Sequence, residues 1–176
     1  MVKLSNNFSN MSPLTGEVIK DYQEADKSEI EASFRRAKEA FDLWKNKRVE
    51  ERVEYISQIR RVIVNNLDQI IDKLVLDTGK VDNEALMTDI LATLDIIQYY
   101  EKNSSQILSS KKKKTPFIYQ NNYSYVEYKP LGIVAVIAPW NFPLQLSLLP
   151  VITALIAGNA VLLKPSEQTP LVGELI

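Results

Sequence analysis

The chain has 176 residues, of which 45% are apolar, so it is long enough for one ordinary hydrophobic core. Its 21 basic and 22 acidic residues give a net charge of −1, which argues against a general attraction to nucleic acid or to an anionic membrane. The absence of Cys and His excludes disulfides, thiolate metal sites, cysteine nucleophiles and Ser-His-Asp triads, and no metal site is predicted.

The N-terminal part of the chain is predicted to be helical. The first 17 residues lack the apolar core of a signal peptide, so a cytoplasmic location is expected. Asp26 and Glu29 have the spacing of a capping box, and apolar residues follow at intervals of three and four. A second helix is expected from about residue 50 to Gly79, and a third from Asp82 to about residue 106. The three helices are expected to bury one shared apolar face.

A β-hairpin is predicted after these helices. The serines and lysines of residues 109–114 are expected to form a solvated linker. Residues 115–120 and 123–129 are rich in aromatic and β-branched side chains, and Asn121-Asn122 between them suits a tight turn. The second of these strands presents two usable faces, so the hairpin is expected to contact another subunit as well as its own chain.

From Gly132 the pattern becomes that of an α/β protein. Residues 133–138 form a short apolar run, typical of a strand buried on both faces of a parallel sheet. A helix is expected from Pro143 to about residue 157, kinked or shortened by Pro150, and residues 160–163 supply a second strand. No charged residue occurs from 130 through 163, but the prolines in this stretch exclude a membrane-spanning helix. The segment therefore predicts a βαβ unit.

The last residues predict the start of another helix. Thr169-Pro170 is a favourable N-cap and first-turn pair, but only six residues remain for the helix itself. One βαβ unit is less than half of a doubly wound nucleotide-binding sheet, so the sequence predicts a truncated chain. We expect three parts: a helical part at residues 1–114, a hairpin arm at 115–129, and the start of a nucleotide-binding domain at 130–176.

Two polar segments follow the predicted parallel strands, at residues 138–143 and 164–167. Ligands bind beyond the carboxyl ends of the strands in open α/β sheets, so both segments are candidates for a binding site. A structural interpretation is also available, in which the prolines stiffen turns, Asn141 caps the next helix, and Lys164 and Glu167 form a surface ion pair. The residues alone leave both interpretations open.

The order of these segments resembles the aldehyde dehydrogenase superfamily. Residues 130–144 (PLGIVAVIAPWNFPL) and 157–171 (AGNAVLLKPSEQTPL) are similar to that family in sequence and in separation. The similarity extends upstream through Thr78-Gly79-Lys80 and covers nearly the whole chain from Ser12. The resemblance implies an α/β fold made of N-terminal helices, a β-hairpin arm and the first βαβ unit of a Rossmann-like sheet. It also implies the N-terminal portion of an NAD(P)-dependent enzyme that oxidises an aldehyde to a carboxylic acid.

The resemblance assigns roles to individual residues. Asn141 would donate its side-chain amide to the oxyanion of a thiohemiacetal. Lys164 and Glu167 would bind the hydroxyls of the adenosine ribose, with Ser166 close by, and the acid at Glu167 favours NAD although some relatives also accept NADP. The nicotinamide side of the cleft would be lined by the main chain of Ile137, Ala138, Pro139 and Trp140.

The chain lacks other parts of that family's machinery. It has no cysteine nucleophile, and it lacks the glycine-bearing pyrophosphate loop and the segment with the general base. By itself it is expected to be inactive and to bind NAD weakly. In the complete enzyme the partners would be an aldehyde and further copies of the chain, contacted through the hairpin arm. Two alternatives remain: a non-catalytic interaction or assembly module derived from the family, and an acyl-phosphate or acyl-CoA reductase, which the Pro-Trp-Asn-Phe-Pro block disfavours.

Overall fold

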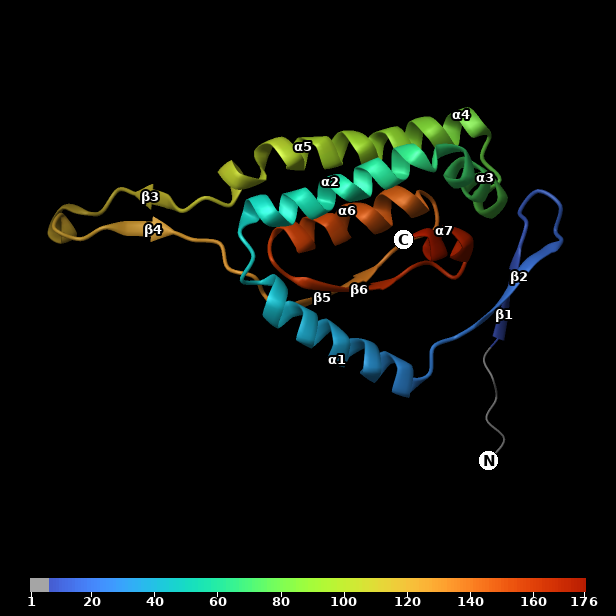
Figure 1. The fold of residues 1–176 in the computed structure, drawn as a ribbon, viewed down its shortest axis with the longest axis horizontal. Helices are drawn as coiled ribbons and strands as arrows, with labels where there is room; N and C mark the ends of the chain where they lie inside the picture. Colours follow the sequence, from blue (N-terminus) through green and yellow to red (C-terminus); the bar gives the residue numbers. More distant parts are fainter. Residues whose placement is uncertain (1–6) are drawn as a thin grey trace.

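The computed structural model of the protein describes residues 7–176 (Figure 1). In Figure 1, α6 lies between the strands β5 and β6 and a layer formed by α2, α3 and α5, while a thin arm extends to one side. The elements in chain order are β1 (Asn7–Met11), β2 (Val18–Gln23), α1 (Lys27–Trp44), α2 (Val49–Asn65), α3 (Leu67–Thr78), α4 (Asp82–Glu84), the π-helix η1 (Ala85–Leu91), α5 (Ala92–Ile107), β3 (Lys111–Lys113), the 3-10 helix η2 (Phe117–Tyr119), β4 (Ser124–Val126), β5 (Ile133–Ile137), α6 (Pro143–Ile156), β6 (Ala160–Lys164) and α7 (Pro170–Leu175).

The predicted βαβ unit is present. β5 and β6 are parallel, with Ile133 opposite Ala160 and Ile137 opposite Lys164, and α6 connects them and continues through Pro150. The expectation that β5 is buried on both faces is wrong, because Val136 is buried whereas Ala135 and Ile137 are exposed. α6 packs on one face of the strands, and α1, on the other face, lies mainly against β6. One face of β5 is therefore covered only in part.

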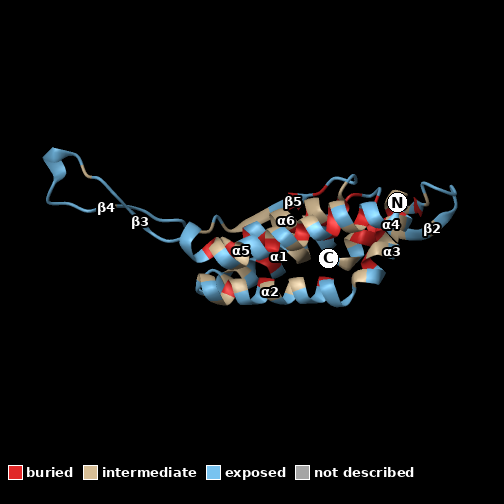
Figure 2. Cartoon of the chain, turned by 90° about the horizontal axis from the view of Figure 1, so that it is seen from above, coloured by how far each residue is buried: buried red, intermediate tan, exposed pale blue. Residues whose placement is uncertain are grey.

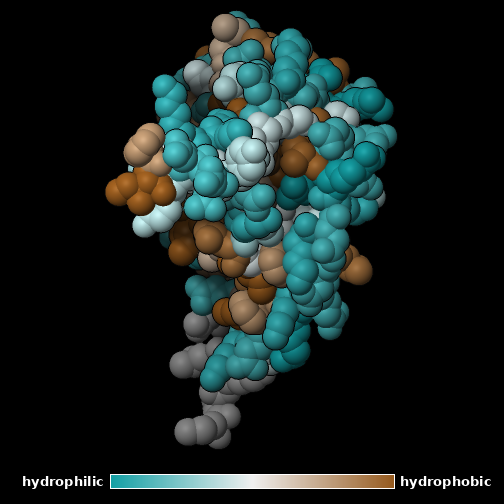
Figure 3. All heavy atoms as spheres, turned by 90° about the vertical axis from the view of Figure 1, so that its left-hand side faces the viewer, coloured by the Kyte–Doolittle hydropathy of each residue, from teal (hydrophilic) through white to brown (hydrophobic). Residues whose placement is uncertain are grey.

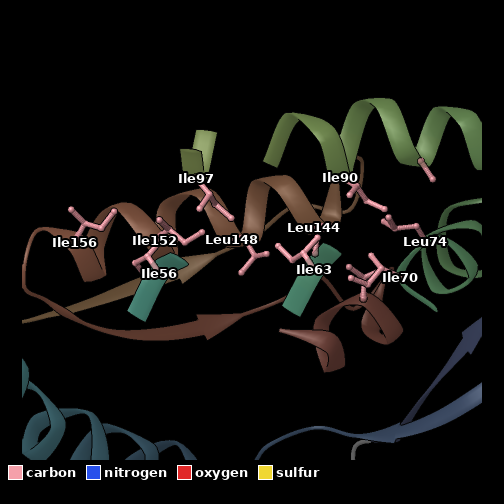
Figure 4. Close-up of a cluster of buried hydrophobic side chains, with 12 residues drawn as sticks. Ile56, Ile63, Ile70, Leu74, Ile90, Ile97, Leu144, Leu148, Ile152 and Ile156 are labelled. Carbon is pink, nitrogen blue, oxygen red and sulfur yellow. The ribbon is translucent and has the colours of Figure 1, made fainter. Parts of the chain in front are cut away.

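The hydrophobic core lies between α6 and the α2–α3–α5 layer. Figure 4 shows its side chains in a row along α6, with isoleucines of α2 and α5 facing the leucines of α6. A continuous aliphatic row of this kind excludes water along the whole length of the βαβ helix, and this burial is the main source of stability. The cluster comprises Ile56, Ile63, Ile70, Leu74, Ala85, Ile90, Ile97, Leu144, Leu148, Ile152, Ile156 and Val172.

α1 has the predicted N-terminus but a different position from the one expected. Asp26 Oδ1 accepts from the Glu29 backbone N–H at 3.0 Å, and Glu29 Oε2 accepts from the Asp26 N–H at 2.8 Å, which confirms the capping box. α1 does not share an apolar face with the other helices, because it lies across the sheet from α6 (Figure 1). Its C-terminal end is fixed by Trp44, whose indole N–H donates to the Leu155 carbonyl at 2.8 Å.

The other two predicted helices are each divided. The second breaks at Asn66, between α2 and α3, and ends as expected at Gly79, which has a φ of +71°. The third is helical from Asp82 to Ile107, but its second segment is the π-helix η1. π-Helical turns are rare in proteins, and those that occur are often found at functional sites. The side chains of η1 are therefore candidates for a functional role. Within residues 7–176, no helix is both long and apolar enough to cross a membrane.

A β-hairpin at the start of the described chain was not predicted. β1 and β2 pair antiparallel, with Phe8 opposite Tyr22, and the register shifts between Asn10 and Met11. The rings of Phe8 and Tyr22 stack with their centroids 5.5 Å apart. This hairpin brings Asn10 against α3 through a side-chain contact with Asp77.

The predicted arm is present, but the prediction that residues 115–120 form its first strand is wrong. β4 pairs with the lysines of β3, with Lys112 opposite Tyr125, whereas residues 115–120 form a loop that contains η2. Pro116 has no N–H to donate to a ladder, which accounts for the end of pairing before it. Figure 2 shows the arm as exposed almost throughout, standing away from the body. Figure 3, which faces the tip of the arm, shows apolar residues scattered among hydrophilic ones.

Candidate active site

The two polar segments begin at the same edge of the sheet. β5 ends at Ile137 and β6 at Lys164, and these residues are opposite each other in the parallel register. Just beyond, the Ala138 N–H donates to the Lys164 carbonyl at 3.0 Å. This hydrogen bond joins the ends of the two strands. Asn141 and Glu167 each lie three residues further along the chain, so both loops start from the same place at the edge of the sheet.

The loop after β5 exposes the residues that sequence analysis selected. Ile137 and Trp140 have 77% and 60% of their surface exposed, and Pro139 and Asn141 are also exposed. Ala138 is buried, which fixes the loop to the sheet between its exposed neighbours. The Asn141 amide is thus presented to solvent at the carboxyl edge, immediately before α6.

A buried aspartate holds the junction between this loop and α6. Asp89, on η1, is fully buried, and its Oδ1 accepts from the backbone N–H groups of Leu144 and Gln145 at 3.2 and 3.5 Å. Its Oδ2 lies 2.6 Å from Lys80 Nζ, which in turn lies 4.2 Å from the centroid of the Phe142 ring. A carboxylate at the first turn of a helix is stabilised by the free N–H groups and by the helix dipole.

The loop after β6 presents an exposed ion pair. Lys164 Nζ lies 2.8 Å from Glu167 Oε2, and both side chains are 61% exposed. The hydrogen bond from Lys164 lowers the pKa of the Glu167 carboxyl, which is therefore ionised at neutral pH. Ser166, by contrast, is buried, and its Oγ accepts from the Gln168 N–H at 3.2 Å, so it shapes the turn.

A second buried aspartate holds the junction between this loop and α7. Asp77, on α3, accepts from the Val172 N–H at 2.8 Å through Oδ2 and from the Asn10 side-chain amide at 2.6 Å through Oδ1. Burial raises the pKa of the Asp77 carboxyl above its ordinary value, and these hydrogen bonds oppose that rise. Close packing adds a further constraint, because a Cβ on Gly173 would lie 2.6 Å from Pro165.

The opposite ends of the strands are joined by Gly158 and Asn159. The Asn159 Oδ1 accepts from the N–H groups of Leu131 and Gly132 at 2.6 and 3.0 Å, and its Nδ2 donates to the Ala154 carbonyl at 3.1 Å. This one side chain therefore connects the start of β5, the end of α6 and the start of β6. It fixes the strand register that brings the two loops together at the other edge.

Sequence analysis did not find the two aspartates. Asp77 and Asp89 occur in amphipathic helices that carry many other acids, so nothing in the spacing separates them from surface residues. The only available signal was their place on the apolar side of those helices. A surface hollow of about 420 Å³ is lined by residues of β2 and α1, including Gln23 and Arg36, and by none of the candidate site residues.

Comparison with known proteins agrees with this arrangement. The family model described as the aldehyde dehydrogenase family matches residues 2–176. The chain is 40% identical over 167 residues to the 4,4'-diapolycopene aldehyde oxidase of Methylomonas sp., covering 94% of this chain and 32% of that protein. The chain thus spans about a third of the length of the curated relatives it matches.

Solved structures of aldehyde dehydrogenases are also similar to this chain. The substrate-bound state of Staphylococcus aureus AldH has 34% identity and a TM-score of 0.79, covering 83% of this chain and 32% of that one. PnpE from Pseudomonas sp. WBC-3, in complex with nicotinamide adenine dinucleotide, has 27% identity and a TM-score of 0.86, covering 96% and 34%. With the family model spanning nearly every residue and the two loops meeting at one edge of a parallel sheet, the chain belongs to the aldehyde dehydrogenase family.

Proposed function

We propose that these 176 residues are the cofactor- and oxyanion-binding portion of an NAD(P)-dependent enzyme that oxidises an aldehyde to a carboxylic acid. The observation that carries the proposal is the pairing of Ile137 with Lys164, which puts the Asn141 amide and the Lys164–Glu167 pair at one sheet edge. Family membership supports the reaction class, and the NAD complex of PnpE supports the cofactor class.

The loop after β6 fits the ribose of a dinucleotide. The exposed Glu167 carboxylate accepts hydrogen bonds and the exposed Lys164 ammonium donates them, which is the pair of functions that neighbouring hydroxyls require. Because Glu167 is a carboxylate at neutral pH, a phosphate on the ribose beside it would meet a like charge. We therefore propose that NAD is preferred over NADP.

The loop after β5 fits the reacting end of the site. In the proposed reaction Asn141 donates its amide N–H to the oxyanion that forms when a thiolate attacks the aldehyde carbon. The main chain of residues 137–140 would line the nicotinamide side of the cleft, and the nicotinamide would supply hydride acceptance when it is bound. The sequence has no cysteine, so the nucleophile is supplied from outside these residues, and the chain alone is expected to reduce no NAD with any aldehyde.

A chimaera tests the proposal. Residues 1–176 would replace the matching third of the Methylomonas 4,4'-diapolycopene aldehyde oxidase, and turnover of that enzyme's aldehyde would be measured. An active chimaera is expected. In it, Asn141→Ala should lower kcat about 10²–10³-fold because an oxyanion donor is lost. Glu167→Gln should raise KM for NAD and reduce the preference for NAD over NADP.

The control variant for the chimaera is Asn122→Ala, at the exposed turn of the arm. This variant should leave kcat, the KM for NAD and the KM for the aldehyde unchanged. A folded chimaera in which Asn141→Ala turns over as fast as the parent would refute the oxyanion role, whatever the behaviour of Glu167→Gln.

We also propose that the arm joins copies of the chain. Phe117 and Ile118 at its tip are 81% and 85% exposed, and β6 has no partner strand on its far side within the described residues. These surfaces also favour the second candidate function, a non-catalytic assembly module. Sedimentation velocity of the chain and of a Phe117→Ser/Ile118→Ser variant tests the role of the arm. Self-association that is lost in the variant is expected, and a chain that stays monomeric at high concentration would contradict both the arm contact and the assembly module.

A further inference from the structure

We infer that Asp77 and Asp89 are the positioning residues of the proposed site, each fixing one of its two loops from the helical layer behind the sheet. The inference rests on the proposed function for its consequence in catalysis, but the positioning itself is a property of this chain. Neither aspartate belongs to the sheet or to either loop.

The two aspartates make equivalent contacts at equivalent places. Each is at least 96% buried and accepts a backbone N–H from the first turn of the helix that follows one loop: Leu144 for Asp89 and Val172 for Asp77. The contacts join residues 55 and 95 positions apart in the chain, so they fix tertiary placement, not local helix formation.

Each carboxylate is itself held by a second group on its other oxygen. Lys80 holds Asp89, and its ammonium also lies over the ring of Phe142, the residue next to Asn141. Asn10 of β1 holds Asp77. Since both oxygens of each side chain are engaged, neither carboxylate can rotate without breaking a buried contact.

The contacts reach different functional groups. The Asp89 network reaches Phe142, the residue next to Asn141, whereas the Asp77 contact holds the first turn of α7, which follows the loop that contains Glu167. A misplacement of the first loop should therefore weaken oxyanion stabilisation, and a misplacement of the second should weaken ribose binding. A variant of either aspartate should therefore affect one loop and leave the other unchanged, so each variant serves as the control for the other.

The experiment compares Asp89→Asn and Asp77→Asn in the 176-residue chain labelled with 15N. Asp89→Asn should shift the Asn141 side-chain amide and the Trp140 indole signal, and should speed hydrogen exchange at Leu144 at least tenfold. Asp77→Asn should do the same at Glu167 and Val172 while leaving the first loop unchanged. Neither readout needs NAD or turnover.

Glu101→Gln is the matched control for loss of a carboxylate charge in the same layer. Its carboxylate pairs with Arg60 at 2.8 Å between α5 and α2 and contacts neither loop, so it should lower thermal stability without shifting either set of signals. If Asp89→Asn fails to fold because Lys80 is left buried and unpaired, Lys80→Met/Asp89→Asn removes both charges. This double variant should show the same loop-specific change.

In the chimaera, Asp89→Asn should lower kcat with little change in KM for NAD, and Asp77→Asn should raise KM for NAD with little change in kcat. The inference is overturned if each variant perturbs both loops equally, or if stability falls and neither loop changes. An inactive chimaera together with loop-specific shifts in the isolated chain would refute the proposed function and leave the positioning intact.

Discussion

The chain contains two pairs of strands that behave differently, β5–β6 in the body and β3–β4 in the arm. β5 and β6 are covered by α6 and in part by α1, and Asn159 ties their starting ends together. β3 and β4 contact mainly each other, and all of their residues except the half-buried Ser124 are exposed (Figure 2). The difference shows that the register of the body is set by packing, whereas the register of the arm depends on its turn and on Pro116.

The largest expected change in the free energy of unfolding comes from truncating core side chains, in contrast to side chains of the arm. Leu74→Ala and Ile97→Ala each remove a fully buried side chain and should lower the free energy of unfolding by about 2–5 kcal/mol. Ile118→Ala, at a residue 85% exposed, should change it by less than about 0.5 kcal/mol. Urea denaturation followed by circular dichroism measures all three. A cost for Ile118→Ala equal to that of Leu74→Ala would mean that the arm is packed in solution.

A smaller effect is expected at the glycine that ends α6. Gly158 has a φ of +91°, and a Cβ there would lie 2.1 Å from Nη1 of the buried Arg52. Gly158→Ala should cost about 1–3 kcal/mol for the backbone strain, and more because the guanidinium has to move. Gly132→Ala is the matched control, since its φ of +129° is strained but no atom lies within 4 Å.

Thermal unfolding of the two glycine variants should rank Gly158→Ala as the less stable. The opposite order would show that Arg52 moves freely and that the close packing around Asn159 does not fix the strand ends.

The smallest of these effects concerns pH. Burial raises the pKa of Asp77 in the folded state above its value in the unfolded chain. Protonation of Asp77 therefore stabilises the folded state at low pH, and this stabilisation is lost as pH rises through the folded-state pKa. Glu174 adds to the rise, while Asn10 and the Val172 N–H oppose it. The stability of the chain relative to Asp77→Asn should therefore increase as pH falls from neutral. Urea midpoints of both proteins between pH 7 and pH 4 measure this, and a flat difference would contradict the direction of the shift.

Much of the body was predictable because its signals are local. The capping box at Asp26, the glycine end at Gly79 and the apolar runs of β5 and β6 are each read from a few neighbouring residues, and all are confirmed. The convergence of the two polar loops followed from a general property of parallel strands. Their placement at one edge therefore needed no long-range information.

The remaining features depend on contacts between distant residues. The position of α1 against the sheet follows from what the other helices leave uncovered, and the roles of Asp77 and Asp89 from backbone donors 95 and 55 residues away. The aromatic residues of the arm predict a first strand at residues 115–120, but Pro116 interrupts that segment, and the lysines before it pair with β4 instead. Side-chain type alone does not decide pairing on an exposed hairpin.

The central claim is that the loops after β5 and β6 form one dinucleotide site, and an NMR titration of the 15N-labelled chain with NAD tests it most directly. We predict weak binding, with a Kd on the order of 1 mM. Amide shifts should occur together at Lys164, Glu167, Trp140 and Asn141, and they should be lost in Glu167→Ala. Shifts limited to one loop, or placed on the arm, would contradict the claim.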